Sequence, residues 1–148
     1  MDNPLIALGS FLAVALLVLL NWWLGGWRQA RIEDAARAAE RYRTDFWNDE
    51  IDAVAVDADG RAALIAIAGP EPAAGLVVAH GDAFVTRRLA PGSVTSTVLG
   101  QDGRLDVRLD DLVLPRVRLR LDGREAERWQ ARLEALARRR TGDALQGV

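Results

Sequence analysis

Residues 104–121 read RLDVRLDDLVLPRVRLRL, and this stretch shows most clearly how the chain folds. Apolar and charged residues alternate on both sides of Pro115, and alternate residues of a β-strand point to opposite faces of a sheet. Each half therefore predicts a strand with one buried face and one face in water. The outward positions hold Arg104, Arg108, Arg116, Arg118 and Arg120. If the two strands pair, these arginines gather on one exposed surface.

Short apolar runs of a similar kind precede this stretch at intervals of about ten residues, which is typical of an antiparallel sandwich or barrel. Turn-forming clusters such as Asp57-Ala58-Asp59-Gly60 separate them, and most connections are short enough for hairpins. The expected strands are residues 51–56, 62–68, 76–79, 83–89, 94–99, 104–109 and 116–121. The sequence therefore predicts seven antiparallel strands.

A helix is predicted to follow the last strand. Asp122 stands three residues before Glu125, as in a capping box, and the arginines at 138–140 are favourable near a helix C-terminus. The apolar stripe of this helix comprises Ala126, Trp129, Leu133, Leu136 and Ala137. We expect the helix to cover one edge or end of the sheet with Trp129 buried, and residues 141–148 to form a flexible tail.

Seven antiparallel strands followed by one helix with a buried tryptophan resemble the pleckstrin-homology-like (PH-like) fold, in which such a helix closes an open end of a bent barrel. The resemblance covers residues 51–140 and rests on the order of the elements. It implies an α+β domain, residues 49–140, built as a seven-stranded sandwich or barrel closed by a C-terminal helix. The family's basic loop between the first two strands is acidic here, with only Arg61 beside it, so inositol-phosphate binding does not carry over.

The N-terminus is one apolar run. Residues 4–24 read PLIALGSFLAVALLVLLNWWL, about 20 residues without a charge, and a helix of that length matches the roughly 30 Å hydrocarbon core of a bilayer. A secretory signal peptide would have a basic start and a small-residue cleavage site, but this chain begins Met1-Asp2-Asn3 and its apolar run ends in tryptophans. We therefore expect residues 1–27 to form an uncleaved, single-pass transmembrane anchor.

Tryptophans and arginines mark the end of this anchor. Trp22, Trp23 and Trp27 suit an aromatic belt at the level of the lipid headgroups, and Arg28 and Arg31 follow directly. No basic residue precedes the anchor, so the positive-inside rule predicts an N-terminus outside and a C-terminal domain in the cytoplasm. The absence of lysine and the abundance of alanine favour a GC-rich bacterial genome, which makes the bacterial inner membrane the expected location.

The segment between anchor and domain predicts an amphipathic helix over residues 27–47, rich in alanine and arginine. Its apolar stripe comprises Ile32, Ala35, Ala39, Tyr42 and Phe46. Three alternatives follow for this juxtamembrane helix, residues 28–48. It is a solvated stalk that spaces the domain from the bilayer, its stripe packs on the domain, or its stripe packs on a partner helix.

Composition excludes several kinds of function. The 148 residues include no cysteine, which excludes disulfides, a thiolate nucleophile and cysteine-ligated metals. The net charge of −2 lacks the positive excess of proteins that wrap nucleic acid, so we expect no nucleic-acid partner.

No group of residues predicts a reaction. His80 lies in a His-Gly-Asp turn without an identifiable nucleophile, and Asp57 and Asp59 lack the downstream ligands of a calcium loop. A third acidic group, Asp106, Asp110 and Asp111, is more simply neutralised by neighbouring arginines. We therefore predict no enzyme activity, no catalytic, cofactor-binding or metal-ligating residue, and no cofactor.

Two classes of function stay open. The first is a membrane-anchored, non-enzymatic binding or scaffolding module whose arginines face anionic lipid or a protein partner of unknown identity. The second is a small accessory subunit of an inner-membrane protein complex. A hollow with convergent arginines would favour the first class, and a contiguous exposed apolar patch would favour the second.

Overall fold

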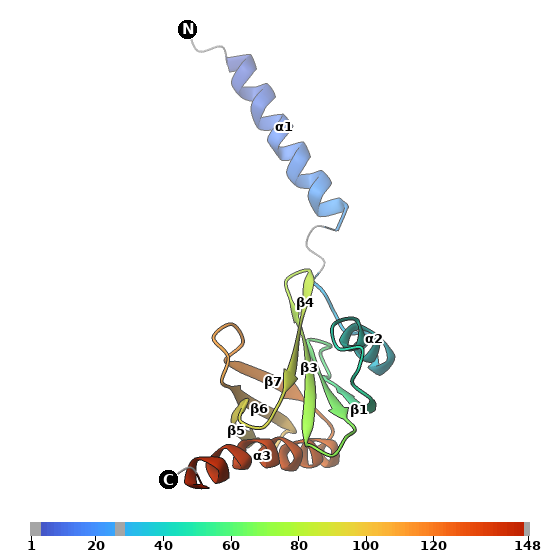
Figure 1. Cartoon of the computed structure of the whole chain (residues 1–148). Helices are drawn as coiled ribbons and strands as arrows, with labels where there is room; N and C mark the ends of the chain where they lie inside the picture. Colours follow the sequence, from blue (N-terminus) through green and yellow to red (C-terminus); the bar gives the residue numbers. More distant parts are fainter. Residues whose placement is uncertain (1–3, 26–28, 147–148) are drawn as a thin grey trace.

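The computed structural model describes residues 4–25 and 29–146, and it separates one long helix from a domain that contains all the strands (Figure 1). Helix α1, Pro4–Trp23, has no buried residue. It is the one helix among the described residues that is long and apolar enough to cross a membrane, judged by length and composition. The predicted apolar N-terminal helix is therefore confirmed at that level.

Seven antiparallel strands form two sheets. Sheet A has the order β1 (Ile51–Val56), β2 (Ala62–Ile67), β3 (Ala73–His80) and β4 (Ala83–Leu89). Sheet B has the order β5 (Val94–Leu99), β6 (Arg104–Leu109) and β7 (Arg116–Arg120). The predicted seven strands are confirmed, although β3 begins at Ala73 and not at residue 76, because Ala73, Ala74 and Gly75 also pair with β2.

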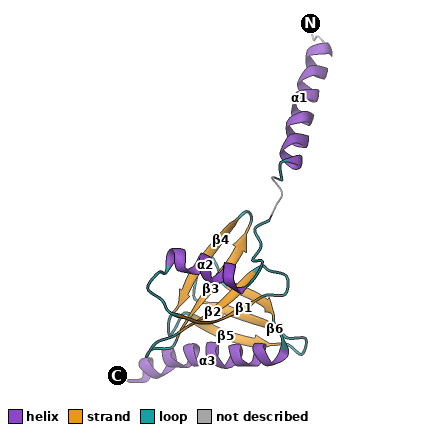
Figure 2. Cartoon of the chain, turned by 90° about the vertical axis from the view of Figure 1, so that its right-hand side faces the viewer, coloured by secondary structure: helices purple, strands orange, loops and turns teal. Residues whose placement is uncertain are grey.

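The two sheets do not close into one barrel within the described part of the chain. Strands β4 and β5 are consecutive, yet they belong to different sheets, and each sheet ends in edge strands. Where a barrel would pair all neighbours, helix α3 (Gly123–Gln146) lies along sheet B and fills the open side (Figure 2). The α+β class is thus confirmed, and the barrel alternative is wrong.

The main core lies between the inner faces of the two sheets and α3. The alternation in residues 104–121 places its apolar half here, as predicted, with Leu105, Val107 and Leu119 almost fully buried. Trp129 is 6% exposed in the same core. Helix α3 continues as far as Gln146, so residues 141–146 are helical and do not form the expected flexible tail. The arginines at 138–140 are favourable near a helix end, but they do not break a helix.

A second core lies on the other face of sheet A, beneath helix α2 (Ala35–Asp45) (Figure 2). Ile32, Ala38 and Tyr42 are buried there against Ile65 and Val77. Of the three alternatives for the juxtamembrane segment, the structure has the one in which its apolar stripe packs on the domain. Both faces of sheet A are therefore covered, which explains why every residue of β2 is buried.

Helix α2 is shorter than the predicted helix over residues 27–47. Asp34 is its N-cap, and the carboxylate of Asp34 accepts a hydrogen bond from the backbone N–H of Arg37 at 2.8 Å. Residues 29–33, before the cap, are not helical, because N–H groups among them bond to turns of sheet A: Ala30 donates to the carbonyl of Gly81 and Ile32 to that of Gly60, both at 2.8 Å. Tertiary hydrogen bonds thus replace the first helical turns.

Candidate functional site

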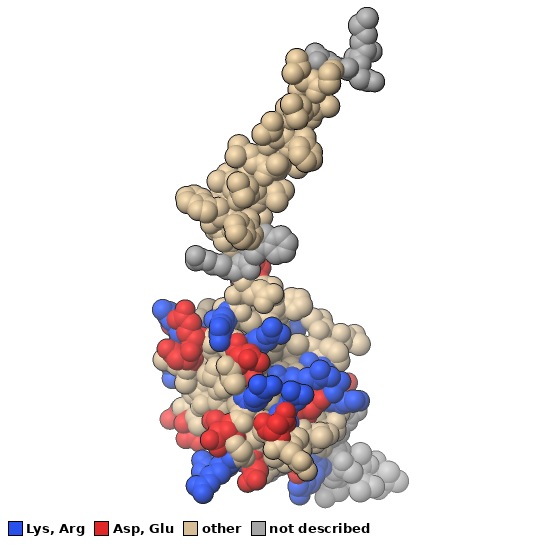
Figure 3. All heavy atoms as spheres, turned by 180° about the vertical axis from the view of Figure 1, so that it is seen from behind, with Lys and Arg blue, Asp and Glu red and all other residues tan. Residues whose placement is uncertain are grey.

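Strands β6 and β7 bring the predicted arginines onto one exposed face of sheet B. Their register places Arg104 opposite Arg120, and Asp106 opposite Arg118, and directly opposed residues point to the same side. All the arginines of the set are exposed. Figure 3 shows arginine side chains, interspersed with acidic ones, on the back of the domain. This surface, here called the arginine face, comprises Arg104, Arg108, Arg116, Arg118 and Arg120.

Asp106 is the carboxylate within the arginine face. Its two oxygens accept hydrogen bonds from Arg116 Nε at 2.8 and 2.9 Å, and Arg116 Nη2 donates a further bond. The nearest oxygen lies 3.6 Å from Arg118 Nε. The bonds from Arg116 hold the pKa of Asp106 below its usual range, and the same contact raises the pKa of Arg116. Asp102 Oδ2 also lies 3.5 Å from Arg104 Nη2. Two carboxylates thus pair with the five guanidinium groups of the set, which leaves an excess of positive charge among these seven residues.

A hollow of about 360 Å³ opens where the arginine face meets the turn between β1 and β2. It is lined by Asp57, Asp59, Arg61, Arg104, Arg118, Leu119 and Arg120. Four arginines thus line one concave surface, together with two aspartates of the turn. This is the combination of concavity and arginines that favours a binding module.

Asp57 joins the β1–β2 turn to β7 and so shapes this hollow. Its side chain is buried, with the residue 6% exposed, and its carboxylate accepts bonds from the backbone N–H of Arg120 at 2.7 Å and of Arg61 at 3.3 Å. Ala58 N donates to the carbonyl of Arg120 at 3.0 Å. The turn therefore carries Arg61 to the arginine face. Sequence reasoning did not include Arg61 in this face, because only the fold of the turn against β7 connects them.

The chain enters the domain beside the same hollow. Gln29, Ala30 and Arg31 line a second concavity of about 550 Å³ together with Asp59 and Arg61. Gly60 makes this close approach possible, because its φ of +67° suits glycine and a side chain there would collide with the carbonyl of Ile32 and with Arg31. The arginine face is thus continuous with the segment that leads to α1.

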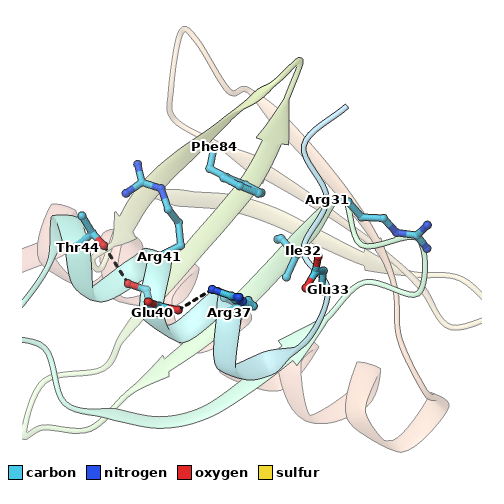
Figure 4. Close-up of a pocket in the computed structure, with 9 residues that line it drawn as sticks. Arg31, Ile32, Glu33, Arg37, Glu40, Arg41, Thr44 and Phe84 are labelled. Carbon is cyan, nitrogen blue, oxygen red and sulfur yellow. Dashed lines mark hydrogen bonds and ion pairs between the residues drawn. The ribbon is translucent and has the colours of Figure 1, made fainter. Parts of the chain in front are cut away.

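A third concavity, of about 320 Å³, lies between α2 and β4 (Figure 4). Figure 4 shows Phe84 on β4, Ile32 on the segment before α2, and Arg37 and Arg41 on α2. Its charged residues on α2 pair within that helix, Arg37 with Glu40 and Arg41 with Asp45, each at 3.3 Å. Because these charges are matched within α2, this groove presents less unbalanced charge than the arginine face.

The residues predicted to mark the membrane interface are only partly described. Trp22 and Trp23 are 65% and 79% exposed on the last turn of α1, where an aromatic belt would place them. Arg31 is exposed at the entry to the domain. Trp27 and Arg28 lie outside the described residues, so their part of the prediction stays a prediction.

The residues considered for catalysis or metal binding are dispersed. His80 is exposed at the end of β3. Asp106 bonds to Arg116, whereas Asp111 bonds to Arg87 Nε at 2.9 Å, so neighbouring aspartates have different arginine partners. Among the described residues there is no group of three or more histidine, cysteine or acidic side chains that could hold a metal ion.

Comparison of the chain with protein-family models, with curated proteins and with solved structures found no match.

Proposed function

We propose that the protein is a membrane-anchored, non-enzymatic binding module, in which a PH-like domain on the cytoplasmic side of a bacterial inner membrane presents the arginine face to an acidic ligand. The observation that carries this proposal is the hollow at the end of that face, which is lined by Arg61, Arg104, Arg118 and Arg120. Planar guanidinium groups suit carboxylates and phosphates, because each can donate two parallel hydrogen bonds to such a ligand.

The anchor supports a role close to the bilayer. Helix α1 is long enough to span, its end carries two exposed tryptophans, and the residues that follow are basic. A domain held there by a short connection stays near anionic headgroups, to which each arginine within reach adds about 1 kcal/mol of attraction. The same charge attracts the acidic segment of a protein partner.

The PH-like part of the proposal rests on the order of the elements. Seven antiparallel strands followed by one helix are the element order on which the resemblance rests, although the strands form two sheets and no closed barrel. The non-enzymatic assignment rests on the absence of an activated base or nucleophile in the described part of the arginine face, which holds only arginines, aspartates and Leu119 around its hollow.

Binding to acidic ligands tests the proposal. The segment from Gln29 onward, which contains both cores, should bind vesicles of phosphatidylglycerol or an acidic peptide in a salt-sensitive manner, and the triple variant Arg104→Gln, Arg118→Gln, Arg120→Gln should not. A matched control, Arg37→Gln with Arg41→Gln and Arg43→Gln, removes the same charge from α2 and should bind normally. If the parent segment binds neither anionic ligand at low ionic strength, the proposed function is wrong.

A second function, an accessory subunit of a membrane complex, is favoured by the loop between β6 and β7. Leu112 and Val113 are exposed there, although the loop is well fixed: Asp111 Oδ1 accepts bonds from the N–H groups of Val113 and Leu114 at 2.8 and 3.1 Å. Apolar side chains held outward in this way suit a protein contact. Under this alternative, a partner protein should co-purify with the chain in mild detergent. Co-purification should be abolished by Leu112→Ser with Val113→Ser and unaffected by the arginine variants.

A further inference from the structure

Strand β7 is an edge strand of sheet B. Its register with β6 determines which of its backbone N–H and carbonyl groups point away from the sheet. Leu121 N donates to the carbonyl of Gly103, and Leu109 N to that of Pro115, both at 3.0 Å. In an antiparallel pair, residues alternate between those bonded to the neighbouring strand and those bonded away from it. Val117 therefore bonds to β6, and the N–H and carbonyl groups of the arginines on either side point outward from sheet B.

These outward groups are free along part of the strand. Arg120 uses both of its backbone groups, since its N–H donates to Asp57 and its carbonyl accepts from Ala58. Within the described part of the chain, the outward backbone groups of Arg116 and Arg118 have no partner, and both residues are exposed. The edge thus offers two N–H and two carbonyl groups in alternation, directly beside the arginine face.

We propose that this edge binds an extended acidic segment of another protein, which adds to β7 as a fourth strand of sheet B. The inference rests on the proposed function and names the partner of the same face. Alternating donors and acceptors along an edge fit a polypeptide backbone. In an antiparallel addition, the residues opposite Arg116 and Arg118 share their face, so acidic side chains there meet guanidinium groups. The residue between them lies on the side where Val117 is buried, which selects an apolar side chain.

The same charge disfavours a second copy of the chain as the occupant. Two antiparallel β7 edges would place arginines of one copy opposite arginines of the other, and like charges directly opposite each other are destabilising. A bilayer matches the charge but offers no regular series of donors and acceptors for the backbone. We therefore expect the segment that binds to β7 to have alternating acidic and apolar residues.

Peptide binding to the full chain in nanodiscs of phosphatidylcholine tests the proposal. The probe is a labelled Glu-Val-Glu-Val-Glu peptide, and one control has the same composition with its glutamates adjacent. A second control carries N-methyl groups on the glutamate amides, which keeps the charge and removes the donors to β7. We expect each control to bind at least about tenfold more weakly, the factor that corresponds to roughly one lost hydrogen bond.

Variants of the edge separate charge from backbone pairing. Arg118→Gln removes the charge alone, whereas Arg118→Pro also removes the N–H, a change that edge strands tolerate. The proline variant should bind the probe at least about tenfold more weakly than the glutamine variant. If the proline variant does not fold, hydrogen exchange on the parent chain decides, because the probe should slow exchange of the Arg116 and Arg118 amides.

Three results would overturn the inference. Equal binding of the N-methylated and parent peptides, without amide protection, would leave a charged surface that recognises acidic ligands but no added strand, so the proposed function would stand alone. Binding to phosphatidylglycerol vesicles with no binding of any peptide would assign the arginine face to lipid. Failure with both ligands would reject the proposed function as well.

Discussion

Tyr42 donates its phenolic O–H to the carboxylate of Asp49 at 2.7 Å, and that carboxylate also accepts a bond from Arg88 Nε at 3.0 Å. These contacts tie α2 to strand β4 across the outer face of sheet A. The tyrosine ring lies against Gly75, where any side chain would collide with it. Helix α2 is therefore an integral part of the domain, and the connection to α1 is limited to the residues before Gln29.

Replacing Tyr42 should separate the contribution of its ring from that of its hydroxyl. Tyr42→Ala empties a fully buried aromatic site and should lower the free energy of unfolding by about 3–5 kcal/mol. Tyr42→Phe removes one hydrogen bond to a charged group and should cost about 1–2 kcal/mol, because Asp49 keeps Arg88. Urea unfolding of the segment from Gln29 onward measures both. Equal stability of the alanine variant and the parent would show that α2 is not docked on sheet A.

Alkaline pH should destabilise the domain through the same residue. Burial, together with the bond to Asp49, raises the pKa of Tyr42 far above its ordinary value of about 10. The unfolded chain therefore loses this proton at lower pH than the folded chain, so the stability is complete below about pH 10 and falls as the pH rises further. Tyr42→Phe should flatten this fall. No other side chain of the lysine or tyrosine type titrates in this pH range, because the chain has no lysine and no other tyrosine.

Trp129 provides a test of the other core. Trp129→Ala should cost about 3–5 kcal/mol, the usual range for emptying a large aromatic site, because the indole is 6% exposed between α3 and the sheets. Arg132 lies over the indole ring at 5.6 Å, and Arg132→Ala should cost less than about 1 kcal/mol. Chemical denaturation compares the two variants. An unchanged midpoint for the tryptophan variant would contradict the docking of α3.

Local patterns in the sequence were sufficient to predict the elements of the main core. Strict alternation around Pro115 gave the correct buried and exposed faces of β6 and β7, and the stripe through Trp129 and Leu133 identified the buried face of α3. Both patterns work because a one-residue shift would move every apolar side chain into water. The membership of the arginine face followed directly from this alternation.

Features that depend on contacts between distant segments could not be predicted in this way. The alanine-rich composition of residues 27–47 favoured a continuous helix, but hydrogen bonds to Gly60 and Gly81 keep residues 29–33 non-helical. Arg61 belongs to the hollow only because Asp57 attaches its turn to β7. The division into two sheets likewise depends on which strands pair, for which short apolar runs carry no signal.

The orientation in the membrane should be set by the arginines on the C-terminal side of α1. A reporter fused after Val148 should be active in its cytoplasmic form and inactive in its periplasmic form, since these arginines oppose translocation. A variant with Asp2→Arg and Asn3→Arg before α1, and with Arg28→Gln and Arg31→Gln after it, moves the positive charge to the N-terminal side. This variant should increase the fraction of molecules whose C-terminal domain lies outside. Periplasmic activity of the fusion to the unmodified chain would contradict the proposed location.

Asp106 should limit the affinity of the arginine face for acidic ligands, because it occupies Arg116 and lies close to Arg118. Asp106→Asn removes the competing carboxylate and should strengthen binding of an acidic peptide by about two- to fivefold, the scale of an exposed ion pair. Asp52→Asn is the matched control, since it removes one negative charge from β1 and should leave the affinity nearly unchanged. A weaker affinity in Asp106→Asn would show that Asp106 positions the arginines more than it competes for them.

The stability of the same variant should depend on pH in a way that verifies the contact. Because bonds from Arg116 hold the pKa of folded Asp106 below its unfolded value of about 3.9, the carboxylate stabilises the domain above that pH and loses this effect as the pH falls through the lower, folded value. The parent chain should therefore exceed Asp106→Asn in stability at neutral pH, and the two should converge in acid. Parallel stability curves would mean that Asp106 is not paired in solution, and the stronger ligand binding would then need another cause.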